Sequence, residues 1–300
     1  MCPLPTNGWA RIAASSALVA ITVTMTPRMS AAGQAPPQCQ PAAGLVRVPE
    51  LPEGSGLAAS RKTPGRFWSH NDSGDAVLFA LDGNGRVTGR LSLPGARVDD
   101  WEAVAVGSCP SGSCIYLADI GDNNAKRQRI TIYRVAEPAA ANGAVEVTGV
   151  FHATYPDRAH DAESLLVTDD GRLLIVTKGD TGPVSLYRFP RQLQSGTTMR
   201  LERVGGPRTP DGKDRITDGA VSPDGRWVVL RSPRELIFHR TSDLLSGNWN
   251  EAGRVALARL GEPQGEGVTF GSDNSLYLMS EGGGGKQPGT FARLTCTLGS

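Results

Sequence analysis

The chain has 300 residues, and its 31 Lys and Arg residues nearly balance its 30 Asp and Glu residues, for a formal charge of +1. This balance, without a basic run, argues against nucleic acid or an anionic membrane surface as the main partner. The 37 Gly and 21 Pro residues are typical of a turn-rich all-β chain.

The N-terminus has the pattern of a secretory signal. Arg11 precedes a short apolar run over residues 12–25, and small residues follow around residues 29–32. The run is too short to span a bilayer comfortably. We therefore expect a signal peptide at residues 1–32, a secreted or periplasmic mature protein without a membrane span, a disordered Pro/Gln/Ala-rich lead-in at 33–43, and one domain at 44–300.

Five short apolar strands open after a small polar or acidic residue along the rest of the chain. Their sequences are SGLAAS, WEAVAV, AESLLV, TDGAVSP and GEGVTF, and the leading residues are Ser55, Glu102, Glu163, Thr217 and Glu266. The leading residues are separated by 47, 61, 54 and 49 residues. Strand-based repeats of this length predict a β-propeller, in which the first strand of each blade lines the central channel.

Each repeat continues as a series of short strands bounded by turns. Four repeats contain four strands each, and the fifth contains three. Residues 44–51 supply a missing outer strand, so we predict five four-stranded blades closed by the two ends of the domain. Six blades are the alternative, because residues 119–155 have room for two extra strands; a β-sandwich is a weaker one. A single helical turn fits residues 241–248.

Four cysteines remain after the signal, an even number that favours disulfides in a secreted chain. Three pairings are possible. Cys109 and Cys114 flank a Pro- and Gly-containing spacer that suits a hairpin staple better than a metal or redox pair. Cys39 and Cys296 then remain, and closure of a propeller would bring these two together.

Asp-containing motifs recur between the first and second strands of three repeats. They are TDDGR, SPDGR and GSDNS. Asp-Gly pairs are common in hairpin turns, and none of these motifs has the ligand pattern of an EF-hand. We interpret them as turns that fix the strand register.

The first strand starts where its antiparallel neighbour ends, so the leading residues should meet the ends of the second strands at one rim of the channel. Polar residues at those ends are Asn71, Asp119, Asp122, Lys178, Arg231 and Glu281. Three leading glutamates and two hydroxyls offer the hard oxygen ligands that Ca²⁺ prefers, without the His or Cys cluster that Zn²⁺ prefers. One central Ca²⁺ is therefore predicted, with Asp218 as an alternative ligand to Thr217. The alternatives are acidic residues that only bind backbone amides, or a purely structural ion.

The same rim predicts candidate catalytic groups. Lys178 and Arg231 could clamp a phosphate or carboxylate, with Asn71 and Glu281 completing a substrate site. Asp119 or Asp122 would act as the general base for a water molecule. The alternative for both cations is ordinary pairing with neighbouring carboxylates.

Several motifs resemble those of known propellers. DWEAVAV, YLADIGDN, HDAESLL, SPDGR and QGEGVTF resemble secreted bacterial propellers of the phytase-like and esterase-like group, over residues 44–298. The resemblance implies calcium and, in some members, phosphate-ester hydrolysis. The leading residues are also distantly similar to the serine and glutamate ring around the central calcium of five-bladed calcium-activated nucleotidases (apyrases). The dense acidic and lysine-rich face of six-bladed bacterial phytases has no full match here.

The sequence thus predicts a secreted, monomeric, calcium-binding propeller that hydrolyses a small phosphoester or related anionic ester. A non-catalytic binding propeller with a structural cation is the second hypothesis. A lactonase-type propeller, which uses a comparable channel calcium, is the third.

Overall fold

The computed structural model describes residues 1–4, 35–207, 215–273, 275–284 and 287–299. The predicted signal peptide falls almost entirely on residues 5–34, which lie outside the described part of the chain. The following description concerns the compact unit that begins at Ala35.

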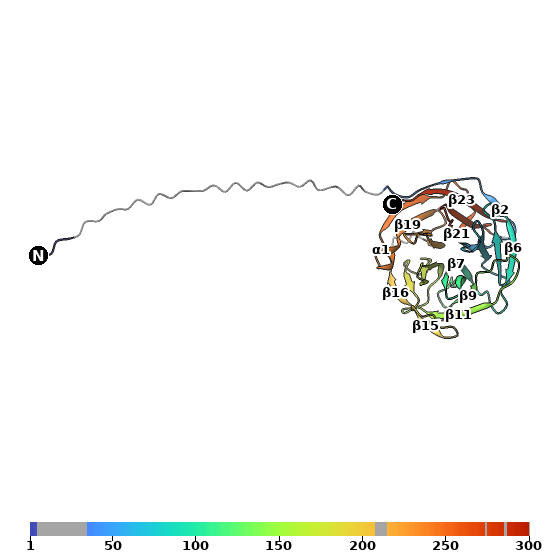
Figure 1. Ribbon diagram of the computed structural model, residues 1–300, viewed down its shortest axis with the longest axis horizontal. Coiled ribbons are helices and arrows are strands. Elements are labelled where there is room, and N and C mark those ends of the chain that lie inside the picture. Colours follow the sequence, from blue (N-terminus) through green and yellow to red (C-terminus); the bar gives the residue numbers. More distant parts are fainter. Residues whose placement is uncertain (5–34, 208–214, 274, 285–286, 300) are drawn as a thin grey trace. The chain divides into compact units, whose positions relative to one another are not determined.

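Five β-sheets form a ring in chain order, as Figure 1 shows. Blade 1 contains β3 (Gly54–Ala59), β4 (Phe67–Asn71), β5 (Val77–Leu81) and β6 (Val87–Ser92). Blade 2 contains β7 (Trp101–Cys109), β8 (Gly112–Asp119), β9 (Ile130–Ala136) and β11 (Val147–Thr154). Blade 3 contains β12 (Ala162–Val167), β13 (Leu173–Thr177), β14 (Leu186–Arg188) and β16 (Glu202–Gly205). Blade 4 contains β17 (Asp218–Val221), β18 (Trp227–Arg231), β19 (Glu235–Arg240) and β20 (Glu251–Ala256).

Blade 5 joins the two ends of the domain and confirms the predicted closure. It contains β21 (Gln264–Phe270), β22 (Leu276–Glu281) and β23 (Gly289–Thr297), and β2 (Val46–Val48) pairs with β23. The predicted disorder of the lead-in at residues 33–43 is wrong for part of that segment, because β1 (Gln38–Pro41) also pairs with β23. β23 is nine residues long and β2 only three, so the rest of its edge has backbone groups that β1 satisfies.

Two short strands cross from one blade to the next. β10 (Gly143–Ala144) pairs in parallel with β6 of blade 1, and β15 (Thr198–Arg200) pairs in parallel with β11 of blade 2. The extra space that suggested a sixth blade therefore holds β10, which extends blade 1. The propeller has five blades.

The core lies between neighbouring blades. Trp68 and Leu78 of blade 1 pack with Trp101 and Leu117 of blade 2, and equivalent apolar clusters fill the other blade interfaces. Each blade is therefore apolar on both faces, as strands buried between two neighbours require. The short helix α1 (Thr241–Leu245) confirms the predicted helical turn.

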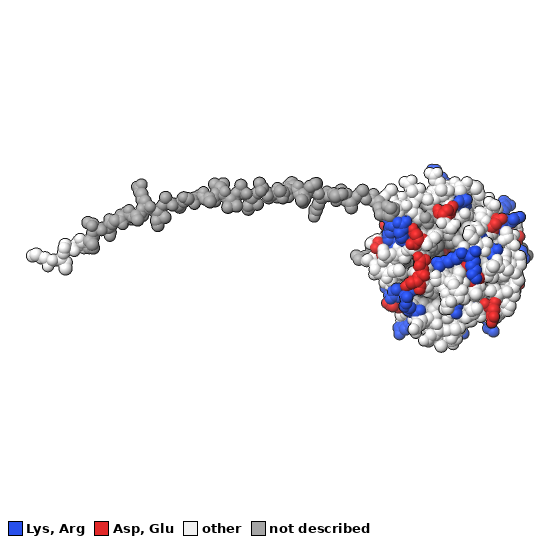
Figure 2. Space-filling view, viewed as in Figure 1, with Lys and Arg blue, Asp and Glu red and all other residues white. Residues whose placement is uncertain are grey.

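Both predicted disulfides are present. Cys39 is bonded to Cys296 between β1 and β23, and Cys109 is bonded to Cys114 across the β7–β8 hairpin. Acidic and basic side chains are interspersed on the face shown in Figure 2. Within the described ranges, none of the helices has the length and apolar character needed to cross a membrane.

Candidate metal and substrate site

The leading glutamates occupy a special position in their strands. In the pairing of first and second strands, the register shifts once in blades 1, 2, 3 and 5. The extra residues at these shifts are Gly56, Glu102, Glu163 and Glu266. A β-bulge leaves its extra residue outside the regular ladder and re-aims its side chain. Three blades thus present a glutamate from the same structural position at one mouth of the channel.

The bulges correct the predicted alignment of the hydroxyl residues. Ser55 and Thr217 lie one position before the glutamate position, which Gly56 occupies in blade 1 and Asp218 in blade 4. Ser55 Oγ donates to the backbone oxygen of Glu102 at 3.0 Å, and Thr217 Oγ1 donates to that of Gly265 at 3.0 Å. Both hydroxyls therefore connect neighbouring blades, and Ser55 Oγ also lies 3.4 Å from Glu102 Oε2, beside one of the glutamates.

Asp218 is buried, and its Oδ1, like Oε2 of Glu163, has no hydrogen-bond partner. Its carboxyl group is fully buried, and its Oδ2 accepts a hydrogen bond from the backbone nitrogen of Val268 at 2.8 Å. Burial raises its pKa well above the ordinary value, while the hydrogen bond from Val268 opposes this rise. Asp218 therefore links blades 4 and 5 inside the channel wall.

Lys178 lies among the glutamates. Its Nζ forms an ion pair with Glu163 Oε1 and lies 3.7 Å from Asp161 Oδ2. Glu163 is only 3% exposed, and its other oxygen, Oε2, is buried without a hydrogen-bond partner. An unpartnered buried carboxylate oxygen is costly, so this site has unused capacity for a donor or a cation.

The other two glutamates are also held in an unfavourable environment. Burial raises the pKa of Glu102 well above its usual range, and the charge of Asp100 adds to the rise while Lys178 opposes it. Burial likewise raises the pKa of Glu266, although Gln264 Nε2 donates to its Oε1 at 2.9 Å. Each carboxylate would be stabilised by additional positive charge.

Two more carboxylates stand at the edge of this group. Burial raises the pKa of Asp72 to about 6, and repulsion from Glu53 adds to it. Burial raises the pKa of Glu281 to about 8, with added repulsion from Glu266. Gln264 Nε2 also donates to Glu281 Oε2 at 2.7 Å and so joins Glu281 to Glu266. We call this set the acidic mouth: Asp72, Asp100, Glu102, Asp161, Glu163, Lys178, Gln264, Glu266 and Glu281.

The predicted general bases are already engaged, which corrects that assignment. Asp119 is 1% exposed, and its Oδ1 accepts from Arg127 at 2.7 Å and from the backbone nitrogen of Asp100 at 3.2 Å. Asp122 Oδ2 accepts from the backbone nitrogen of Arg127 at 2.6 Å. Both carboxylates hold the loop after β8 in place.

Arg231 is likewise unavailable to a substrate. Its side chain is fully buried, with an ion pair to Glu262 at 2.6 Å and hydrogen bonds to the backbone oxygens of Gly267 and Met279. Asn71 is only half-buried, but its amide accepts from the backbone nitrogen of Glu53 and donates to the backbone oxygen of Glu50. Of the predicted substrate-binding residues, Lys178 and Glu281 belong to the acidic mouth.

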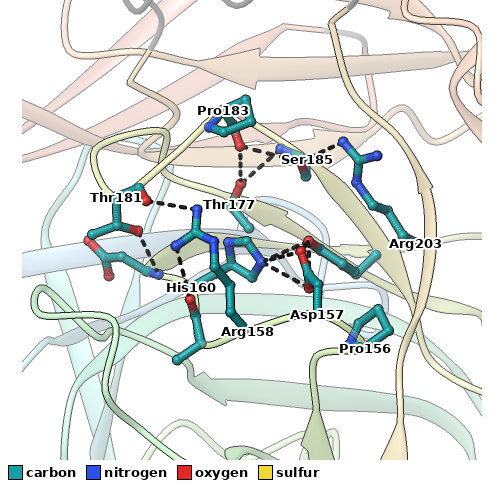
Figure 3. A network of polar contacts seen from close by, with 12 residues as sticks. Pro156, Asp157, Arg158, His160, Thr177, Thr181, Pro183, Ser185 and Arg203 are labelled. Atoms are coloured by element: carbon teal, nitrogen blue, oxygen red, sulfur yellow. Dashed lines mark hydrogen bonds and ion pairs between the residues drawn. The ribbon is translucent and has the colours of Figure 1, made fainter.

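A polar network supports the segments that carry Asp161 and Lys178 (Figure 3). His160 Nε2 lies 3.1 Å from the Asp157 carboxylate and 2.8 Å from the Tyr187 hydroxyl. Arg158 donates to the backbone oxygen of Thr181 at 2.8 Å. The network fixes the chain just before Asp161 and just after Lys178.

Four members of the acidic mouth, namely Asp72, Asp100, Asp161 and Gln264, were not among the predicted site residues, although the sequence contains a signal for the last three. Asp100, Asp161 and Gln264 each stand two residues before a leading glutamate. The contacts of two of them bring them to the glutamates: Gln264 donates to Glu266, and Asp161 lies near Lys178, which forms an ion pair with Glu163.

The donor chemistry fits Ca²⁺, because the acidic mouth offers carboxylate oxygens without thiol or imidazole groups. The positions of these carboxylates, in contrast to their chemistry, do not form a complete set of metal ligands. No three His, Cys, Asp or Glu side chains of the described residues converge in an arrangement that could hold a metal ion. Lys178 on Glu163 and Gln264 on Glu266 account for this, since each occupies an oxygen that an ion would use.

No protein-family model and no curated protein matches this chain. Among solved structures, it is similar to the PQQ-bound aldose sugar dehydrogenase from Streptomyces coelicolor, with 14% identity and a TM-score of 0.53 over 88% of this chain and 100% of that chain. It is also similar to a gluconolactonase from Xanthomonas campestris, with 12% identity and a TM-score of 0.43 over 80% of this chain and 72% of that chain. The first likeness shows the propeller fold alone, and the second carries no argument. The phytase-like and nucleotidase resemblance therefore stays a prediction from the motifs.

Proposed function

We propose that the acidic mouth binds one Ca²⁺ and that the protein is a metal-dependent hydrolase of a phosphoester or related anionic ester. The observation that carries the proposal is the buried Glu102, Glu163 and Glu266, presented by bulges of three blades, with one oxygen of Glu163 unpartnered. Two disulfides favour an oxidising, extracytoplasmic location.

The three glutamates would hold the ion, which supplies positive charge to polarise the ester and to acidify a water molecule. Lys178 has a second task in this proposal. If Glu163 held an ion, the Lys178 ammonium group would keep Asp161 as a neighbour and would be available to bind the negative charge of the substrate. In this proposal Lys178 alone binds the substrate anion, a role that was predicted from the sequence for Lys178 and Arg231 together.

Glu281 and Asp72 replace Asp119 and Asp122 as the candidate general bases. An efficient general base has a pKa near the working pH. The pKa of Asp72 is raised to about 6 and that of Glu281 to about 8, mainly by burial, and both side chains stand at the open edge of the acidic mouth. At neutral pH the carboxyl group of Asp72 is therefore mostly ionised and can take a proton from water, whereas that of Glu281 is mostly protonated and acts as a base only as the pH approaches 8.

A panel of phosphomonoesters, phosphodiesters, carboxylic esters and lactones, assayed with Ca²⁺ or with a chelator, tests the proposal. We expect chelator-sensitive turnover of an anionic ester, its loss in Glu163→Gln, and a fall in kcat at neutral pH of about 10²–10⁴-fold in Asp72→Asn. Asp169→Asn, the same kind of charge change in the turn after β12, should leave turnover intact. Failure of every substrate, or turnover that ignores the chelator, would contradict the hydrolase.

A non-catalytic propeller with a structural ion is the second candidate. The observation in its favour is that the three glutamates come from different blades, close to where Ser55 and Thr217 already connect neighbouring blades. An ion at this level would tie blades 2, 3 and 5 together. Ca²⁺ that raises the melting temperature while no substrate turns over would support this candidate instead.

A further inference from the structure

The channel has a second hollow at the end opposite the acidic mouth. This cavity has a volume of about 540 Å³ and is lined by the later residues of the first strands of all five blades and by the turns that follow them. We call it the turn-side cavity. Its volume falls in the range of small-molecule sites, about 300–1,000 Å³. None of the residues of the acidic mouth lines it.

Small side chains keep the turn-side cavity open. Ala59, Ala105 and Ala220 line it with small side chains, and Gly219 allows close packing against Ser164 and Leu166 of blade 3. Apolar groups such as Val106, Val167 and Phe270 complete the walls. The interior therefore suits an apolar ligand body.

One cation is presented at the entrance. The neighbours of Arg61 are anchored to the same residue of blade 2: Ser60 Oγ donates to the Glu137 carboxylate, and Lys62 Nζ donates to the Glu137 backbone oxygen, both at 2.5 Å. Arg61 stands between these anchors and lines the cavity. Its position is therefore fixed by the fold, although its side chain is 38% exposed.

The contacts of Arg61 are weak and exchangeable. Its guanidinium donates to Ser108 Oγ at 3.1 Å and to Asp169 Oδ1 at 3.5 Å, and the Asp169 side chain is 57% exposed. A long ion pair between exposed groups contributes little to stability. The other acidic residue of the lining, Asp273, already has a cation of its own, because Arg293 lies 2.8 Å from it.

We propose that the turn-side cavity binds a small amphipathic anion. The apolar body of the ligand enters the channel between the first strands, and its anionic group pairs with Arg61 in place of Asp169. A carboxylate can receive two parallel hydrogen bonds from a guanidinium, which the present contacts of Arg61 do not provide. This site is separate from the proposed hydrolase site and does not depend on it.

Titration calorimetry with three naphthalene probes tests this proposal. The probes are 2-naphthoate, 2-naphthalenemethanol and 2-naphthylmethylammonium, which share one apolar body and differ in charge. We expect 2-naphthoate to bind with one molecule per chain and with the highest affinity of the three. Arg61→Ala should weaken it about tenfold or more, since a charge-assisted hydrogen bond is lost.

Further variants distinguish binding inside the cavity from binding elsewhere on the protein surface. Arg86→Ala is the control, because Arg86 also makes a surface ion pair, with Asp82 at 3.3 Å on the β5–β6 hairpin, and does not line the cavity; it should leave 2-naphthoate binding unchanged. Ala220→Phe should fill the cavity and abolish binding, with Ala105→Leu as a milder substitute if the first variant unfolds. Ca²⁺ binding should persist in Arg61→Ala.

Three results would overturn the proposal. They are no binding of 2-naphthoate to the folded protein, equal or tighter binding of the alcohol or the ammonium probe, and binding that is unchanged in Arg61→Ala. A loss of Ca²⁺ binding or turnover in acidic-mouth variants has no bearing on this result, so the two sites fail or succeed independently.

Discussion

At the scale of single residues, Lys178 and Arg231 show how two cations near the ends of second strands come to differ. Each follows or ends the second strand of its blade, and each meets carboxylates. Lys178 remains at the acidic mouth with 9% exposure, whereas Arg231 is fully buried and paired with Glu262. Arg231 therefore stabilises the contact between blades 4 and 5, and only Lys178 can meet a ligand.

Replacing Arg231 with Met should lower the free energy of unfolding by about 3–5 kcal/mol, because Glu262 would be left as an uncompensated buried charge. Arg226→Met is the control. The Arg226–Asp224 pair has a similar length, 2.7 Å against 2.6 Å, but the Arg226 side chain is 56% exposed. Its loss should cost about 0–1 kcal/mol. Urea unfolding measures the free energy of unfolding of both variants. Equal losses in the two would contradict the structural role assigned to Arg231.

At the scale of elements, the ring is closed by pairing between strands from the two ends of the domain. β1 and β2 both pair with β23, and Cys39–Cys296 fixes β1 to it across 257 residues of sequence. Cys109–Cys114 closes a loop with a separation of only 5. The two bonds therefore constrain the unfolded chain to very different degrees.

Replacing Cys39 and Cys296 together with Ser should lower the free energy of unfolding by about 5 kcal/mol on the chain-entropy estimate, against about 2 kcal/mol for the Cys109 and Cys114 pair. Guanidinium unfolding of the two double variants compares them directly. A loss from the short hairpin that equals or exceeds the loss from the terminal pair would show that closure by β1 is unimportant.

The blades and strands also show how much of the fold could be predicted from the sequence. The repeat of apolar strands predicted five blades, and the short blade 5 predicted its completion by residues 44–51, because period and strand count are local properties. β1 was missed because Gln38 and Pro41 have low strand propensity, and only the free edge of β23 makes a strand of them.

The candidate site was predicted less well than the fold. Bulges set the positions of Glu102, Glu163 and Glu266, but a bulge depends on the partner strand and leaves no period in the sequence. Ser55 and Thr217 stand one residue before the position that the glutamates occupy in their strands. The engagement of Asp119 by Arg127 was also invisible, because it depends on how the loop after β8 folds back.

At the scale of the whole molecule, the two ends of one channel have opposite chemistry. The acidic mouth gathers carboxylates whose pKa values are raised by burial, whereas the turn-side cavity is apolar with Arg61 at its entrance. We expect the first to attract cations, and we propose that the second takes a small anion through its local pairing with Arg61. A propeller permits this separation, because the two ends of its first strands are formed by different turns.

Calcium titration of the protein by calorimetry at neutral pH tests the central claim most directly. We predict one Ca²⁺ per chain, loss of binding in Glu163→Gln, and unchanged binding in Asp169→Asn, which removes a charge at the other end of the channel. A protein that binds no Ca²⁺, or a Glu163→Gln variant that binds it as well as the unaltered chain does, would contradict the cation site.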